Sequence, residues 1–235
     1  MINYNASELL ISIHMPKCGG VSLQRVLKSW YKRKFYLHYY NEKKNKLPKK
    51  ITLGKTFFGK DNSNCCIHGH FNKYRNFGIN QYYPEARQFI TFLRDPLEIL
   101  ISNYFFSTRN GYYYRNGKKF QATESIESYF EKRLINEQSW FETHLPDGIN
   151  KNNYEDFIHS KFIFIGVMDY YQESVNLLAD KLNKPRKELP YINKSPREPY
   201  NLSKKLIENF KEKFEFDYLL YNFALDQIHQ SQIHR

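Results

Sequence analysis

The segment LLISIHMPKCGGVSLQRVLKSWY, residues 9–31, decides how the rest of the chain is interpreted. It opens on a short apolar run typical of a buried strand and closes on apolar residues spaced like one face of a helix. Lys17, Gly19 and Gly20 lie in the turn between them. Because glycine lets the backbone approach a ligand closely and a helix N-terminus favours negative charge, this turn can cradle a phosphate. An ordinary tight turn gives the same pattern, so the segment alone leaves both interpretations open.

Strands alternate with helices along the rest of the chain. Apolar runs predict further strands at 35–40, 65–70, 88–94 and 161–167. Helices are expected near 95–106, 123–135, 153–160, 171–183 and 203–230, with a basic loop at 108–122. This alternation predicts an α/β fold that is P-loop-like, with three layers, α/β/α, around a mostly parallel central sheet. The length of 235 residues fits a single domain, residues 1–235.

Composition limits the partners and the compartment. Lys and Arg number 36 against 24 Asp and Glu, a net charge of +12 that favours an anionic partner without saying which one. The three cysteines form no paired framework, which fits a reducing compartment. The apolar runs are too short to span a membrane, and no basic region followed by an apolar one opens the chain. We therefore expect a cytoplasmic protein without a transmembrane segment, unless a targeting segment has been removed.

A second informative segment is FITFLRDPLEILISNYF, residues 89–105, which places Arg94 at the carboxyl end of a strand and Ser102 two helical turns later. Together with HMPKCGGVSL at 14–23, it resembles the sulfotransferases that use 3′-phosphoadenosine-5′-phosphosulfate (PAPS). The similarity is greatest to carbohydrate sulfotransferases, in particular the 2-O-sulfotransferase branch and its bacterial relatives. It is specific over 9–31 and 65–106. It is weaker over 162–182 and 217–225.

The helix of this second segment has a strong start signal. Asp95 can cap it, Pro96 suits its first turn, and Glu98 completes a capping-box pattern. Asp95 serves that cap, so the segment shows no acidic residue suited to hold Mg²⁺.

The resemblance implies where the cofactor binds. The first motif would hold the 5′-phosphosulfate, with Lys17 reaching the leaving oxygen, and the second would hold the 3′-phosphate through Arg94 and Ser102. A basic loop at 193–199 would close over the 3′-phosphate, unless it is a solvated surface loop. The other residues assigned to PAPS and its product PAP (adenosine 3′,5′-bisphosphate) are Cys18, Gly19, Gly20, Val21, Ser22, Lys194 and Ser195, with Arg197 as a further contributor.

The sequence departs from the family pattern at two of these positions. Cys18 and Val21 stand where the family often has threonine, and the missing hydroxyl at residue 21 should weaken cofactor binding somewhat. Cys18 at a helix N-terminus is either a reactive thiol with a lowered pKa or an inert small residue.

Sulfuryl transfer to a hydroxyl needs a general base, and histidine suits this role. The segment IHGHFNK, residues 67–73, carries His68 and His70, which point to the same side of an extended chain. The 2-O-sulfotransferase branch has a similar His-Gly-His. We expect His70 to be the base and His68 to orient the acceptor or the cofactor, with core histidines or a metal pair as the alternatives. No third metal ligand is evident, so no metal is expected, and His14 is interpreted as structural.

The sequence therefore predicts a PAPS-dependent sulfotransferase that acts on a hydroxyl acceptor, with a polysaccharide or glycolipid favoured. The basic loop at 108–119 is either an acceptor-binding lid or a surface loop. A nucleotide phosphotransferase is the first alternative, but the GxxxxGK[ST] loop is absent because Lys17 precedes the glycines. A nucleic-acid-binding module is the second, but the positive charge is scattered and no reader motif is present, so no nucleic acid partner is expected.

Overall fold

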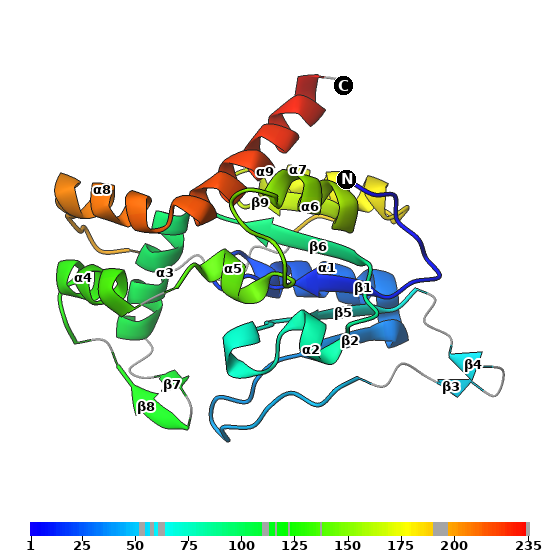
Figure 1. Cartoon of the computed structure of the whole chain (residues 1–235), viewed down its shortest axis with the longest axis horizontal. Coiled ribbons are helices and arrows are strands. Elements are labelled where there is room, and N and C mark those ends of the chain that lie inside the picture. Colours follow the sequence, from blue (N-terminus) through cyan, green and yellow to red (C-terminus); the bar gives the residue numbers. More distant parts are fainter. Residues whose placement is uncertain are drawn as a thin grey trace.

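The fold is a parallel sheet covered by helices, as seen in a computed structural model of the chain (Figure 1). The structure describes residues 1–51, 55–56, 59–60, 64–109, 113–115, 117–121, 123–136, 138–189 and 197–233. The main sheet has five strands in the order β2-β5-β1-β6-β9, all parallel. Their bounds are β1 Leu10–Ile13, β2 Phe35–His38, β5 Cys66–Gly69, β6 Gln88–Leu93 and β9 Phe162–Val167. This architecture confirms the predicted α/β class.

Four of these strands are buried along their whole length, which is why each reads as a continuous apolar run. Burial on both faces requires helices on both sides of the sheet. The helices of the body are α1 Gly20–Tyr31, α3 Pro96–Arg109, α6 Tyr154–Lys161, α7 Tyr171–Lys181 and α9 Glu215–Ile233. The ends of α1 and α7 are joined where Trp30 Nε1 donates to the Pro185 carbonyl at 3.0 Å.

A second apolar cluster lies beside the sheet. Figure 1 shows α4 (Ile126–Asn136) and α8 (Lys204–Lys213) packed with α3, and the cluster is formed by Leu100, Ile101, Phe105, Tyr129, Phe130, Leu206, Phe210 and Phe214. The sequence predicts one helix over 203–230, but α8 ends before Phe214 and α9 begins at Glu215. The break lets α8 turn its apolar side to this cluster while α9 packs on the main core through Leu220, Ala224 and Ile228.

The expected basic loop at 108–122 is only partly a loop. Strands β7 (Tyr113–Arg115) and β8 (Lys118–Phe120) form an antiparallel hairpin, with Gly117 at a positive φ of 80°. The Gly117 N–H donates to the Glu42 carbonyl at 2.8 Å and so docks the hairpin on the turn at 41–46. Four further short elements were not expected: α2 Ile79–Tyr82, α5 Trp140–His144, β3 Lys55–Thr56 and β4 Gly59–Lys60.

In the described part of the chain, no helix combines the length and the apolar character that crossing a membrane requires.

Candidate active site

Three neighbouring strands deliver the candidate residues to one edge of the sheet. His14 follows β1, His70 follows β5 and Arg94 follows β6. The strands are parallel and pair in the order β5-β1-β6, so their carboxyl ends lie together. This is the edge where open α/β sheets bind ligands.

The turn after β1 is shaped as an anion cradle. Lys17 and Gly19 both have left-handed backbones, with φ of 62° and 72°. Helix α1 then starts at Gly20 without a side-chain cap and without an acidic residue in its first turn. Its first N–H groups have no intrahelical acceptor, so an anion at this point would be held by donors and by the helix dipole.

Tyr171 of α7 fixes this turn from the side. Its hydroxyl donates to the Gly19 carbonyl at 2.5 Å and accepts from the Leu23 N–H at 3.1 Å. A Cβ added at Gly19 would meet the Tyr171 ring at 2.8 Å, so glycine is required there for both its φ and its size.

Two of the residues assigned to the cofactor already have an engaged backbone N–H. The Cys18 N–H donates to the Met15 carbonyl at 3.2 Å, and the Ser22 N–H donates to the Gly19 carbonyl at 3.0 Å. The Ser22 side chain is buried, whereas the Val21 side chain is 46% exposed. The amides of Gly19, Gly20 and Val21 therefore remain the best placed for a ligand among the residues assigned to this turn.

The thiol of Cys18 is inert. The side chain is 1% exposed, its Sγ donates to the Pro16 carbonyl at 3.5 Å, and burial raises its pKa. The reactive-thiol interpretation is therefore wrong, and Cys18 is the small core residue that the sequence left as the alternative. Cys65 and Cys66 are also buried, and none of the three cysteines is in a disulfide.

Lys17 and Arg94 form a pair of cations beside the turn. Arg94 NH1 lies 3.5 Å from the Lys17 carbonyl oxygen, and Lys17 Nζ lies 4.1 Å above the Phe106 ring of α3. Burial lowers the pKa of Lys17 to about 8, and repulsion from Arg94 adds to the effect. Glu98, Ser102 and Phe106 are spaced four residues apart on α3, so Ser102 lies on the helix face that meets this pair.

Glu98 does not complete the predicted capping box. Asp95 Oδ1 accepts from the Glu98 N–H at 3.0 Å, as expected for the cap. The Glu98 carboxylate turns instead to Arg94 and Arg197, because two guanidinium groups attract it more strongly than one backbone N–H. Arg197 is thus brought to the Arg94 site, whereas Lys194 and Ser195 lie outside the described residues.

His70 is held in one tautomer. Its Nδ1 lies 2.7 Å from the His14 carbonyl oxygen, which can only accept, so Nδ1 carries the proton and Nε2 keeps its lone pair. The side chain is half-buried, and burial lowers the pKa of His70 to about 4. The imidazole is therefore neutral at pH 7, as a general base must be.

His68 does not reach the surface. It is 0% exposed, its Nδ1 lies 2.9 Å from Ser12 Oγ, and burial lowers its pKa to about 3. It points to the same side as His70, since both rings stack on His14. Complete burial and these contacts match the core alternative, while the role of orienting the acceptor or the cofactor stays a prediction.

The structure adds two histidines that the sequence did not assign to the site. His14 stacks on His70 with ring centroids 4.2 Å apart, and its Nδ1 lies 2.8 Å from the Tyr39 hydroxyl. A Cβ added at Gly20 would lie 1.9 Å from His14 Nε2, so the His14 ring fills the space between the cradle and His70. His144 of α5 meets His70 edge-on at 6.1 Å and donates through Nδ1 to the Trp140 carbonyl at 2.8 Å.

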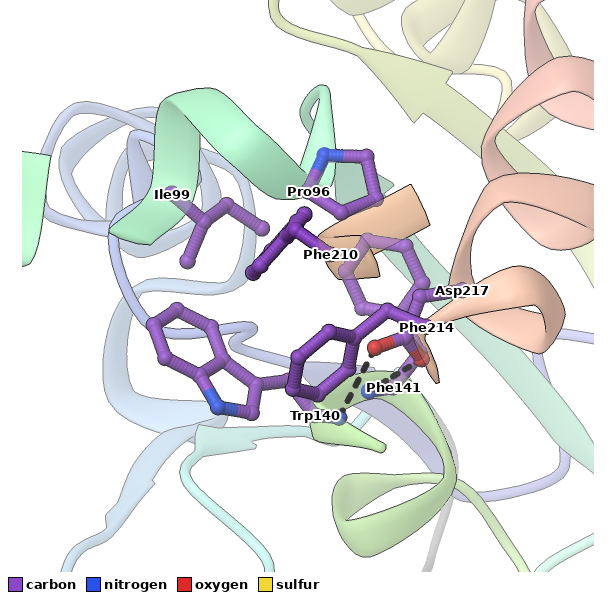
Figure 2. Close-up of a pocket in the computed structure, with 7 residues that line it drawn as sticks. All are labelled: Pro96, Ile99, Trp140, Phe141, Phe210, Phe214 and Asp217. Carbon is purple, nitrogen blue, oxygen red and sulfur yellow. Dashed lines mark hydrogen bonds between the residues drawn. The ribbon is translucent and has the colours of Figure 1, made fainter. Parts of the chain in front are cut away.

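Asp217 of α9 fixes α5 and therefore His144. Figure 2 shows its carboxylate at the start of α5, joined to the N–H groups of Trp140 and Phe141, from which it accepts at 3.0 and 3.1 Å. The carboxylate also accepts from the Ser139 hydroxyl. Burial raises the pKa of Asp217 to about 6. The adjoining pocket of about 10 Å³ has room for one water at most, so it is a packing defect and not a ligand site.

Among the described residues, no group of three His, Cys, Asp or Glu side chains is placed to hold a metal ion.

Comparison with known proteins supplies the family. The model of the sulfotransferase family matches residues 1–224. No curated protein matches the sequence. Among solved structures, the chain is similar to a mouse sulfotransferase, SULT7A1, complexed with PAP, with 13% identity and a TM-score of 0.48. The match covers 80% of this chain, and the chain spans 62% of the length of the mouse protein.

Proposed function

Because the chain belongs to the sulfotransferase family, we propose that it transfers a sulfuryl group from PAPS to a hydroxyl group of a carbohydrate acceptor. The observation that carries this proposal is the arrangement around the turn after β1. Lys17 and Arg94 lie on one side of an uncapped helix N-terminus, and the neutral base His70 lies one ring away on the other. A polyanionic donor and a hydroxyl acceptor are the reactants that such a site suits.

The binding assignments follow from this arrangement. The amides of Gly19, Gly20 and Val21 would hold the 5′-phosphosulfate with Lys17, and Arg94, Ser102 and Arg197 would hold the 3′-phosphate. Lys194 and Ser195 remain predicted contributors. When bound, PAPS supplies the sulfuryl group and a phosphate leaving group.

The chain's own residues act on the proton and the charge. His70 Nε2 accepts the proton of the acceptor hydroxyl as the new S–O bond forms, and it then returns that proton to solvent. Lys17 neutralises the charge that develops on the leaving phosphate oxygen as the old S–O bond breaks, which is an interaction of the transition state.

An anionic or polyhydroxylated carbohydrate is supported by the surface next to His70. Docking of the hairpin on the turn at 41–46 gathers exposed lysines, namely Lys43, Lys44, Lys46, Lys118 and Lys119. Glu42 of this turn pairs with Arg75, whose guanidinium lies 4.1 Å above the Tyr40 ring. Exposed lysines gathered in this way attract the carboxylate or sulfate groups of an acidic sugar.

Calorimetry with three nucleotides tests the donor. We expect PAP to bind at least about tenfold more tightly than adenosine 5′-phosphate, because a charge-assisted contact to the 3′-phosphate contributes roughly 1.5–3 kcal/mol. Arg94→Ala should remove this preference and leave adenosine 5′-phosphate binding unchanged. Preferential binding of ATP–Mg²⁺ would instead favour a phosphotransferase. A screen of polysaccharides, glycolipids and small alcohols with radiolabelled PAPS then identifies the acceptor.

A further inference from the structure

Glu98 joins two arginines that come from distant parts of the chain. Arg94 NH2 donates to Glu98 Oε2 at 2.9 Å, and Arg197 NH1 lies 2.8 Å from the same oxygen. The first pair is only four residues apart in the sequence, at the start of α3. The second pair joins residues 98 and 197. A single carboxylate oxygen therefore fixes the distance between the two guanidinium groups.

Two like charges do not converge in this way without an anion between them. The arginine side chains are 19% and 28% exposed, so water screens their mutual repulsion only in part. The Glu98 carboxylate, itself 36% exposed, offsets that repulsion. Each guanidinium has five N–H donors. Arg94 uses one on Glu98 and one on the Lys17 carbonyl, and Arg197 uses one on Glu98, so among the described contacts each keeps further donors for a second anion.

We propose that Glu98 is a positioning residue for the 3′-phosphate of the nucleotide, because it holds Arg94 and Arg197 so that both face one phosphate. This rests on the proposed function. Glu98 acts through the arginines and does not touch the nucleotide. The three side chains together keep a net charge of +1, so the clamp still attracts an anion. Without Glu98, the Arg197 side chain would sample other directions. The conformational entropy lost when it is ordered would then weaken nucleotide binding.

The test compares Glu98→Gln with Asp180→Asn by calorimetry, using PAP and adenosine 5′-phosphate as ligands. Asp180→Asn is a matched control, since it changes the charge by the same amount and breaks the surface pair between Asp180 of α7 and Arg186, away from the site. We expect Glu98→Gln to weaken PAP roughly fivefold, the scale for ordering one or two long side chains. Adenosine 5′-phosphate should bind it as it binds the wild type, and Asp180→Asn should match the wild type with both ligands.

A double-mutant cycle with Arg197→Ala separates positioning from simple charge. If Glu98 acts through Arg197, Glu98→Gln should weaken PAP much less in the Arg197→Ala background than in the wild type. Unchanged or tighter PAP binding by Glu98→Gln would overturn the proposal, as would full additivity of the two substitutions. A wild type that does not distinguish PAP from adenosine 5′-phosphate would overturn the proposed function and this proposal with it.

Discussion

His14 and His70 stack with ring centroids 4.2 Å apart and planes 22° apart, while the His14 carbonyl oxygen accepts the Nδ1 proton of His70. The two residues follow strands that pair directly, at Ile13 and Gly69, so they are cross-strand neighbours. The backbone of one histidine therefore selects the tautomer of the other, and its ring shields that imidazole from water. The bond to the carbonyl raises the pKa of His70, but burial outweighs it and keeps the ring neutral at neutral pH.

Replacing His70 by Ala should lower the turnover roughly 10²–10⁴-fold, the usual cost of losing a general base, while PAP affinity is retained. His159→Ala, on the outer helix α6, is the control and should not change turnover. Single-turnover transfer with the identified acceptor, together with calorimetry, measures both quantities. Near wild-type turnover of the His70 variant would remove it from the mechanism.

The acid limb of kcat/KM should lie well below the ordinary histidine value of about 6.5. The reason is that burial lowers the pKa of His70 to about 4. Activity should therefore be almost constant from pH 7 to pH 5 and fall below that, provided the protein stays folded. A limb centred between pH 6 and 7 would contradict the environment seen for His70.

Lys17→Met should reduce turnover far more than it reduces PAP affinity, since the charge of Lys17 acts mainly in the transition state. Methionine keeps the length and the same backbone preference, so the left-handed turn at this residue is equally strained. The lowered pKa of Lys17, about 8, also predicts a loss of kcat/KM as the pH rises through 8. The Lys17→Arg variant stays charged, so its pH profile should lack this basic limb. A basic limb that persists in this variant would contradict the assignment of the limb to Lys17.

Acid should destabilise the folded protein through His68. Its folded-state pKa of about 3 lies below the unfolded value, so the unfolded chain binds more protons between these limits. The contribution of His68 to stability is fully present above pH 6.5 and falls by about 1.4 kcal/mol per pH unit below it. Asp217 opposes the trend, because its pKa is raised to about 6. Urea unfolding from pH 7.5 to 4.5 should show a shallower decline for His68→Asn than for the wild type, and equal slopes would refute the assignment.

Gly20→Ala should destabilise the protein by about 1–3 kcal/mol, because the added Cβ overlaps the His14 ring. Val21→Ala is the matched control, since the Val21 side chain is 46% exposed and changes little on truncation. The double variant His14→Ala with Gly20→Ala should recover part of the loss in urea unfolding. No recovery would show that the clash lies elsewhere.

The strands were predictable because buried parallel strands are continuous apolar runs, as in FITFL and FIFIGV. The cradle was predictable because its glycines and the following helix start are local in the sequence. The hairpin at 113–120 was missed because its basic, tyrosine-rich strands show no alternating apolar pattern, and its docking on Glu42 is a long-range contact.

The histidine cluster and the arginine clamp depend on contacts that no local pattern records. His14 meets His70 only because β1 and β5 pair in one register, and uniformly apolar strands do not encode register. His144 reaches His70 from a five-residue helix that is held by Asp217 of α9. In the sequence Glu98 fits a capping-box pattern. Only the folded structure, which brings Arg197 next to it, shows that its carboxylate pairs with this arginine.

The buried thiols can report on opening of the folded structure, because they react only when it exposes them. Cys18 lies under the cradle and Cys66 begins strand β5 of the main sheet, and each is at most 1% exposed. An alkylating reagent can modify either one only after that region opens. Local fraying of the turn would tag Cys18 alone, whereas Cys66 would be tagged only when the sheet itself comes apart. The ratio of the extents of alkylation at Cys18 and at Cys66 thus separates local opening of the cradle from global unfolding without any engineered label.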